Sequence, residues 1–573
     1  MVKSRIAGAC FPTPTPKVAS SSGSSTTRTS LDRTFQRLPV PCLNLGALVF
    51  EPMNPTINAD QDRVPLRQHW VLIALIAVAS VANLNLAVAN VALPSIGIAF
   101  QASQLQLTIV SIGFSVGLAS TVLYLGGIGD RYGRKTMLIL GMALTIPTSL
   151  LAAWAPSVEI LILARILGGV AAGMAFPTTL SLITALWTGH GRTRSIALWS
   201  AIGGSMIAVA SLLSGWLLGV AWWGLVFAIT APLAAISLLL AWIVVPAHVN
   251  ETKDKVDHLG GILSLLGILS LTLAIDFVAD PAERRASIIA GAIAIISLLG
   301  FFIAQRRVAN PLFDLAYAKR RTFWVAAAAG LIVFGSLMGV TYVSQQFMQN
   351  VLGYSPLKAG ATIVPAALSM ILTAPLSAKL ISRYGSRITL LIGYVFLFFA
   401  LLVSLVSWNA NASIWVVELS IVLMGAGVGF AGTPASHSLT GSVPVHRAGM
   451  ASGTADLQRD LGGSVMQSLL GTILTAGYAV SIANQAAAAK QPVPTNVVAE
   501  IQRSFSGAEI IAKQYPTHAN QIIEAAKSSF MDGSHWAYAA GLIAIVVGAI
   551  VVAIFFPGKT AEQSQFKQYQ SED

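Results

Sequence analysis

The sequence predicts an all-α integral membrane protein of about fourteen spans, arranged as two six-helix bundles with two extra central helices between them. Three observations lead to this fold class. The chain is 55% hydrophobic and only 10% charged, whereas a soluble domain carries roughly 25% charged residues. Apolar runs of about 20 residues follow one another along most of the chain. A charged hairpin sequence also recurs half a chain later, as expected of a protein built from two related halves.

The predicted spans begin at Trp70 and continue almost to the end of the chain. We place them near residues 70–93, 105–125, 136–154, 158–180, 195–219, 223–246, 260–279, 286–305, 323–345, 359–380, 388–407, 413–435, 450–478 and 534–556. The expected parts are a first six-helix bundle at 69–250, two extra helices and a linker at 251–322, and a second six-helix bundle at 323–557. The stretch 479–533 is polar, so we expect short amphipathic helices outside the membrane, followed by a tail at 558–573.

Residues 1–68 differ from the rest because they are rich in Ser, Thr and Pro and contain no acid before Asp32. We expect this tail to be disordered. Its composition also resembles an organelle transit peptide, and a start codon placed too far upstream, with Met53 as the true first residue, is a further explanation.

The charge and cysteine content exclude several functions. The net charge of +12 comes from cations in short loops between apolar runs, which does not indicate nucleic-acid binding. Both cysteines, Cys10 and Cys42, precede the first apolar run, so we expect no disulfide framework, metal site or thiol nucleophile in the membrane region. Neither a phosphate-binding loop ending in Gly-Lys-Ser/Thr nor a nucleophile elbow stands out. The sequence therefore predicts neither an enzyme nor a bound cofactor.

Basic residues are concentrated in alternate loops. The loops on one side contain Arg131, Arg134, Lys135, Arg192, Arg194, Lys253, Lys255, Arg306, Arg307, Lys319, Arg320, Arg321, Arg383, Arg387 and Arg447. The loops on the other side hold only Arg284, Arg285 and Lys358 among short connections. The positive-inside rule then predicts a cell (inner or plasma) membrane protein with both termini in the cytoplasm.

The stretch Gly126–Lys135 reads Gly-Gly-Ile-Gly-Asp-Arg-Tyr-Gly-Arg-Lys between two apolar runs, which predicts a tight polar turn. Asp130 can pair with a neighbouring arginine, and the glycines allow close backbone approach. Ser382–Arg387 is a weaker copy of Asp130–Lys135, offset by 383 − 131 = 252 residues. A basic loop alone is common in membrane proteins, but this recurrence favours a two-fold repeat.

The order of residues 126–135 resembles the hallmark loop after the second helix of major facilitator superfamily transporters. The resemblance implies alternating access by rocking of two bundles about a central cavity. It also implies that the two hairpins form a conformational latch on the cytoplasmic side. The latch candidates are Gly126, Asp130, Arg131, Gly133 and Arg134 in the first hairpin and Arg383, Gly385 and Arg387 in the second.

Further motifs resemble the fourteen-span drug:proton antiporter group of this superfamily. The segment 164–177 resembles its fourth-helix motif, in which Arg165 would tune a proton-carrying site; an arginine reaching the membrane interface is the alternative. Leu84–Pro94 resembles the first-helix signature, with Asn85 where the group usually carries Asp. Asn85 and Asn90 are candidates for substrate contact in the cavity, or else polar contacts between helices. The fifth span, at 210–215, lacks the usual Gly-Pro motif.

Residue 85 is an asparagine, which cannot carry a proton. If transport is coupled to protons, an acid at another position must therefore carry them. Asp456 and Asp460 are four residues apart on one helical face beside Arg459, and they are coupling candidates together with Arg165. A salt-bridged helix end is the alternative interpretation. Asp276 lies near the end of its span, where we expect an interfacial side chain.

Three functions remain open at this point. The first is proton-coupled export of amphipathic or hydrophobic small molecules, as in multidrug efflux. The second is facilitated or proton-coupled movement of a metabolite or lipid, and the third is a membrane sensor on a transporter fold. The expected partners are a small-molecule substrate, protons and membrane lipids, with the chain acting as a monomer and without nucleic acid.

Overall fold

The computed structural model describes residues 67–187, 189–247, 256–278, 281–443, 448–489 and 493–570. The predictions for residues 1–66, Lys253, Lys255 and Arg447 lie outside this part of the chain, as do those for the side chains of Asp130, Arg192 and Arg194.

Fourteen helices in the described residues are long and apolar enough to cross a membrane, which confirms the predicted all-α fold class. The first six spans are α1 (Arg67–Phe100), α2 (Gln104–Tyr132), α3 (Arg134–Ala153), α4 (Val158–Leu186), α5 (Gly189–Val220) and α6 (Leu225–Ala228) continued by α7 (Thr230–Val244). The two extra spans are α8 (His258–Phe277) and α9 (Arg284–Gln305). The last six are α11 (Arg321–Asn350), α12 (Pro356–Ala361) continued by α13 (Ile363–Tyr384), α14 (Ser386–Ser407), α15 (Ile414–Gly441), α16 (Ala448–Ala487) and α19 (Ala519–Phe555).

Local sequence sets where these helices begin. Ser103 and Gln106 form a capping box at the start of α2, in which Ser103 Oγ accepts from the Gln106 N–H at 3.2 Å and Gln106 Oε1 accepts from the Ser103 N–H at 2.9 Å. Asp257 caps α8 in the same way, since its carboxylate accepts from the Gly260 N–H at 2.8 Å. These side chains satisfy backbone donors that a helix start leaves unpaired.

Within each bundle, glycines allow helix backbones to touch. A Cβ atom on Gly169 of α4 would lie 2.1 Å from the Phe114 carbonyl oxygen of α2. A Cβ on Gly425 of α15 would likewise lie 2.1 Å from the Ala366 carbonyl oxygen of α13. Both pairs are the second and fourth spans of their bundles, so the two halves pack in the same way.

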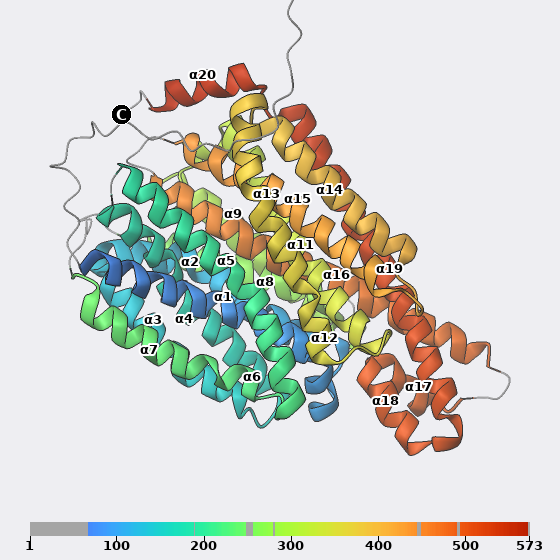
Figure 1. The fold of residues 1–573 in the computed structure, drawn as a ribbon. Coiled ribbons are helices and arrows are strands. Elements are labelled where there is room, and N and C mark those ends of the chain that lie inside the picture. The colour runs from blue at the N-terminus through green and yellow to red at the C-terminus, as the bar shows by residue number, and fades with distance from the viewer. Residues whose placement is uncertain are drawn as a thin grey trace, which may run out of the picture. The chain divides into compact units, whose positions relative to one another are not determined.

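The two extra helices, α8 and α9, lie on one side of the boundary between the bundles. The helix α8 packs against both α2 and α16, which belong to different bundles, and α9 packs on α8 (Figure 1). Thr472 Oγ1 of α16 donates to the Ile275 carbonyl of α8 at 3.0 Å, and Tyr124 of α2 contacts His258 Nδ1 at 2.9 Å. The α8 helix therefore contacts both halves across their shared boundary.

The two ends of the helical assembly carry different small helices. The helices α17 (Thr495–Arg503) and α18 (Phe505–Gln514) lie at one end, and α20 (Lys559–Gln570) lies at the other (Figure 1). We call these the α17–α18 end and the basic end, the latter containing the turns at Gly133 and Gly385. The α16 helix has 40 residues and spans roughly 60 Å, twice the hydrocarbon thickness. For this reason, part of the stretch 479–533 that we expected outside the spans is a helical extension of α16 and α19.

Candidate functional site

Both charged hairpins turn on a single glycine. The α2 helix continues through Tyr132, so most of the predicted turn at 126–135 is helical, and only Gly133 interrupts it with a φ of 110°. Gly385 separates α13 from α14 with a φ of 87°, and it lies 385 − 133 = 252 residues later. These backbone angles favour glycine, because a Cβ atom is strained there. The repeat in the sequence is thus a repeat in backbone geometry.

Cations after each turn bind the last turn of the final helix in the same bundle. Lys135 Nζ donates to the Trp242 carbonyl of α7 at 2.9 Å, and Arg387 donates to the Ala553 carbonyl of α19. These two cations are also 387 − 135 = 252 residues apart. Carbonyl groups at helix C-termini carry partial negative charge, so a cation stabilises them. Each hairpin is held to its own bundle by this contact.

The second hairpin is completed by the C-terminal helix α20. Glu562 is buried, and its carboxylate accepts from the Ser386 N–H at 3.0 Å and the Ser438 hydroxyl at 3.4 Å. Lys559 Nζ also donates to the Arg383 carbonyl at 3.0 Å. The first hairpin has Asp130 in its sequence, whereas the second has Ser382 at the matching position, and Glu562 brings a carboxylate to it from elsewhere in the chain. Sequence analysis missed this residue because it lies in a polar tail.

The linker between α9 and α11, residues 306–320, contacts the first hairpin and the helix α20 that completes the second hairpin. A Cβ on Gly127 of α2 would lie 2.9 Å from Leu312 Cδ2 of the linker. Arg320 donates to the Ser442 carbonyl at 2.7 Å and lies 3.8 Å from the ring centroid of Tyr569 in α20. Both hairpins therefore lie at the same end of the helices, while the latch role stays a prediction.

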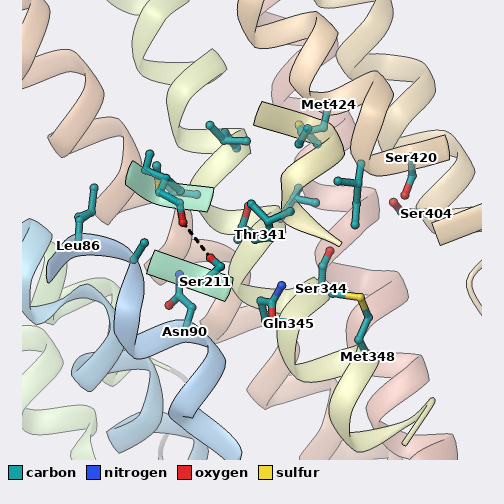
Figure 2. A pocket seen from close by; sticks show the side chains of 18 residues that line it. Leu86, Asn90, Ser211, Thr341, Ser344, Gln345, Met348, Ser404, Ser420 and Met424 are labelled. Atoms are coloured by element: carbon teal, nitrogen blue, oxygen red, sulfur yellow. Dashed lines mark hydrogen bonds between the residues drawn. The ribbon is translucent and has the colours of Figure 1, made fainter. Parts of the chain in front are cut away.

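A cavity of about 730 Å³, counting its open part, lies between the bundles. Figure 2 shows Asn90 and Ser211 of the first bundle across from Thr341 and Gln345 of the second. The described residues that line this cavity include no Asp, Glu, Lys, Arg or His. Three methionines, at positions 338, 348 and 424, add flexible apolar surface. The lining suits uncharged apolar groups with a few hydrogen-bonding atoms.

Gln345 is a cavity residue that sequence analysis did not single out. Its Nε2 donates to the Ala359 carbonyl at 2.9 Å, while its Oε1 is buried and has no hydrogen-bond partner among the described residues. The signal in the sequence was the polar run 341–346 within an otherwise apolar span. An unpaired buried acceptor costs free energy, so a ligand donor would be favoured here.

The structure separates the two asparagines of the first helix. Asn90 lines the central cavity, and its Oδ1 accepts from Ser111 Oγ, which in turn accepts from Gln467 Nε2 of α16. Asn85 instead lines a smaller cavity of about 230 Å³ inside the first bundle, together with Arg165. Of the two predicted substrate contacts, only Asn90 faces the space between the bundles.

Arg165 is fully enclosed rather than extended to an interface, so that alternative is wrong. Only 2% of its surface is exposed. Its Nη1 donates to the Asn85 carbonyl at 2.8 Å and its Nε to the Val110 carbonyl at 3.2 Å, which joins α4 to α1 and α2. Its guanidinium carbon lies 5.1 Å and 5.5 Å from the ring centroids of Phe114 and Phe227. A role in coupling stays a prediction.

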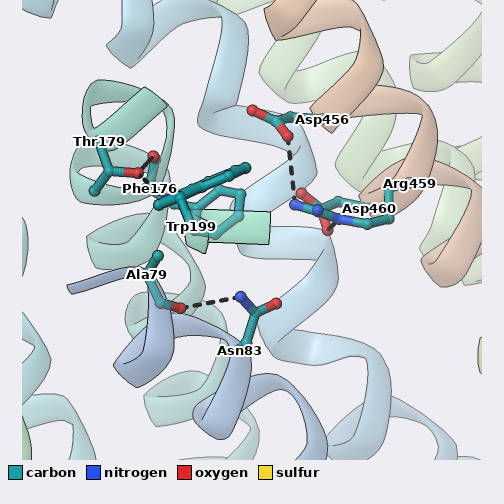
Figure 3. Close-up of polar contacts among 8 residues, drawn as sticks. All are labelled: Ala79, Asn83, Phe176, Thr179, Trp199, Asp456, Arg459 and Asp460. Carbon is teal, nitrogen blue, oxygen red and sulfur yellow. Dashed lines mark hydrogen bonds and ion pairs between the residues drawn. The ribbon is translucent and has the colours of Figure 1, made fainter. Parts of the chain in front are cut away.

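Asp456 and Asp460 form one cluster with Arg459, as their spacing predicts (Figure 3). Arg459 Nη2 lies 3.4 Å from Asp456 Oδ1, and its Nε lies 3.5 Å from Asp460 Oδ1. Both acids are buried. The guanidinium also lies 4.9 Å from the ring centroid of Phe176 in α4, so the cluster reaches across to the first bundle. The structure contains the predicted salt bridges, and the coupling role of the two acids stays a prediction.

Hydrogen bonds between the bundles gather toward the α17–α18 end. Gln104 of α2 donates to the Tyr342 hydroxyl at 3.0 Å and to Gln346 Oε1 at 2.9 Å, and Tyr342 also contacts Thr108 Oγ1 at 2.7 Å. Gln349 of α11 donates to the Val91 carbonyl of α1 at 3.0 Å. These contacts hold the bundles closed at this end.

Two membrane-spanning bundles with a cavity between them define the architecture of a secondary transporter. The profile of the Major Facilitator Superfamily matches residues 75–466, and the chain belongs to this family. Its members are transporters rather than enzymes, and the chain is accordingly a multi-pass membrane transporter.

The similar curated proteins agree with the resemblance seen in the sequence. The multidrug efflux pump LfrA of Mycolicibacterium smegmatis is 31% identical over 86% of this chain and 97% of its own length. The multidrug resistance protein Stp of Mycobacterium tuberculosis is 28% identical over 82% of this chain and 88% of its own length. Placement near the drug:proton antiporter group is confirmed.

Solved structures of the same fold are more distant in sequence. A bacterial homologue of the human lysosomal transporter Spinster, in an inward-facing and unoccupied conformation, matches with a TM-score of 0.61 at 17% identity, over 88% of this chain and 99% of that one. The xylose transporter XylE from E. coli matches with a TM-score of 0.53 at 14% identity, over 86% of this chain and 98% of its own. These likenesses confirm the major-facilitator fold.

Proposed function

We propose that the chain exports neutral or amphipathic hydrophobic small molecules across the cell membrane by alternating access, driven by protons. The observation that carries this proposal is the cavity between the bundles, whose described lining has no ionisable side chain and offers Asn90, Ser211 and Gln345 for hydrogen bonds. A site of this kind accepts varied apolar molecules, because methionines and scattered polar atoms adapt to different shapes. The names of the multidrug efflux relatives support the same function.

The orientation of the chain in the membrane follows from the placement of charge. The basic end carries the cations of both hairpins and of the linker, which supports a cytoplasmic location for this end and for both termini. The bundles are in contact at the α17–α18 end, so the described conformation is the one closed toward the outside. Arg165, Asp456 and Asp460 are the proposed coupling residues, and the hairpins are the proposed latch, in a monomeric transporter.

Growth of a drug-sensitive host tests export directly. Expression should raise tolerance to uncharged amphipathic compounds such as chloramphenicol or tetracenomycin C in a strain that lacks its own efflux pumps. Gln345→Leu removes the unpaired acceptor of the cavity and should narrow the set of tolerated compounds. Gln563→Leu, an exposed residue of α20, makes the same chemical change outside the cavity and should behave as wild type. No gain of tolerance to any compound would contradict drug export.

A second candidate function is facilitated or proton-coupled transport of a specific metabolite or lipid. It is favoured by Asn85, which stands where the drug:proton antiporter group usually carries Asp. The cavity that Asn85 shares with Arg165 has no acid among its described lining residues that could bind a proton. Vesicle transport with and without an imposed pH gradient separates the two. Efflux of several unrelated compounds that stops without the gradient supports the first candidate. Movement of a single compound, or gradient-independent movement, supports the second.

A further inference from the structure

Asp276, near the end of α8, is an acid that has no role in the transport mechanism proposed above. It is 0% exposed, and neither of its carboxylate oxygens has a hydrogen-bond partner within the part of the chain that the structure describes. The expectation of an interfacial side chain is therefore wrong, because α8 is packed against α16 at this position, where Ser468 faces Asp276. The α8 backbone is fixed here, since Ser287 donates to the Ala274 carbonyl at 2.9 Å and Thr472 donates to the Ile275 carbonyl at 3.0 Å.

The described groups that face Asp276 do not supply a positive charge. Ser468 of α16 faces it with a buried hydroxyl that has no other partner, and Tyr342 of α11 lies within its electrostatic reach. The charged residues on the packed helices lie further away. On α16 these are Asp456, Arg459 and Asp460, with Asp460 eight residues before Ser468; on α9 they are the exposed Arg284 and Arg285; α2 has none from Gln104 to Gly129.

A buried carboxylate that faces one hydroxyl and no cation is costly in its charged form, by several kcal/mol. The described conformation is therefore compatible with a neutral, protonated Asp276. The α8 helix that carries Asp276 packs against both α2 and α16, and so lies along the boundary between the bundles (Figure 1).

A row of polar groups leads from Asp276 to the α17–α18 end. Tyr342 bonds to Gln104, and Gln104 bonds to Gln346. These two glutamines line a cavity of about 240 Å³ whose wall includes Glu509 of α18. Proton pathways in membrane proteins follow polar and acidic side chains of this kind, and separation of α2 from α16 would admit water along the row.

We propose that Asp276 is a proton-binding site of the transport cycle. The carboxylate takes up one proton from water on the α17–α18 side while the bundles are apart at that end, and closure then buries the neutral carboxylic acid. No other bond forms or breaks in this step. The inference rests on the proton coupling in the proposed function, and it adds that the extra helices, through α8, carry a coupling residue.

Infrared spectroscopy tests the proton directly and needs no substrate. Wild-type protein in liposomes at neutral pH should show the C=O stretching band of a protonated carboxylic acid, and Asp276→Asn should lack it. Asp257→Asn is the matched control, because Asp257 is a buried acid on the same helix whose carboxylate has partners, Gly260 and Gln305, and asparagine also caps helices. A spectrum of Asp276→Asn identical to wild type would overturn the proposal.

Transport of Hoechst 33342 by proteoliposomes tests the role in the cycle. Asp276→Asn should lose pH-gradient-driven transport while retaining exchange of the dye across the membrane without a gradient, because the asparagine imitates the protonated acid in shape and charge. Gradient-driven transport at the wild-type rate would overturn the role in the cycle. Loss of exchange as well, in folded protein, would make Asp276 a structural residue and also overturn it. If wild type itself is indifferent to the gradient, the coupling in the proposed function fails, while the infrared band still reports whether Asp276 holds a proton.

Discussion

Replacing Tyr342 by Phe should open the bundles at the α17–α18 end. The change removes only the hydroxyl, which accepts from Gln104 Nε2 at 3.0 Å and contacts Thr108 Oγ1 at 2.7 Å. One such hydrogen bond stabilises a folded state by about 1 kcal/mol net. Gln104 keeps Gln346, and Thr108 keeps the Gln104 carbonyl, so neither partner is left unpaired. Losing both bonds therefore weakens closure by about 2 kcal/mol, which is roughly a 30-fold shift toward the state open at this end.

Distances between spin labels measure this shift. Cys10→Ser and Cys42→Ser remove both native thiols, and cysteines at the exposed positions Val220 and Ala410 then carry one label on each bundle at the α17–α18 end. Pulsed electron paramagnetic resonance on Tyr342→Phe should show a larger fraction of long distances than the wild-type background.

The matched control is Tyr394→Phe. Tyr394 is equally buried, but its hydroxyl donates to the Ala329 carbonyl at 3.1 Å, which joins α14 to α11 within one bundle. This variant should lose stability without changing the label distances. An unchanged distance distribution in Tyr342→Phe, or an equal change in both variants, would refute the idea that hydrogen bonds across the boundary hold this end closed.

Three further predictions concern the basic end and the α17–α18 end. Gly385→Ala introduces a side chain at a φ of 87° and should lower stability by about 1–2 kcal/mol, measured by thermal unfolding. Gly291→Ala on α9, whose Cβ would make an ordinary contact with Ala274 Cβ at 3.9 Å, should be neutral or stabilising. Glu562→Gln weakens the charge-assisted bond to the Ser386 N–H by about 1–2 kcal/mol, so limited proteolysis should release α20 faster; unchanged cleavage contradicts this. Burial raises the pKa of Glu509, so the folded state binds a proton more tightly than the unfolded chain and stability falls as pH rises above the usual range of a glutamate. Glu509→Gln removes this loss, and its gain in melting temperature over wild type should appear at neutral pH and vanish at acidic pH.

The fold could be predicted because the bilayer imposes a length and a composition on each element. Runs of about 20 apolar residues identify spans irrespective of their partners, and all fourteen appeared as helices. The ends of the helices were harder to predict, because polar residues continue a helix beyond the membrane when they pack against protein. The extension of α16 to Ala487 and the start of α19 at Ala519 show this.

The site could be predicted only where spacing along one helix or a repeat determines it. The cluster around Arg459 follows from the i, i+3 and adjacent positions of its acids, and the two hairpins follow from their shared sequence. The environments of Asn85 and Asp276 depend instead on which helices pack beside them, which no local pattern records. Asn85 lies one residue away from the cavity-lining Leu86, yet it faces into the first bundle.

The two hairpins show how an inherited repeat is kept where backbone geometry requires it and changed where a side chain can be supplied from elsewhere. Glycine recurs at 133 and 385 because no other residue adopts those φ values without strain. The cations at 135 and 387 recur because each bundle ends in a helix whose carbonyls need one. The acid of the first hairpin does not recur, since Glu562 of α20 reaches the Ser386 N–H from outside the repeat. A carboxylate can be brought to the second hairpin by a tail, and a backbone conformation cannot, so the sequence of this hairpin could lose its acid but not its glycine.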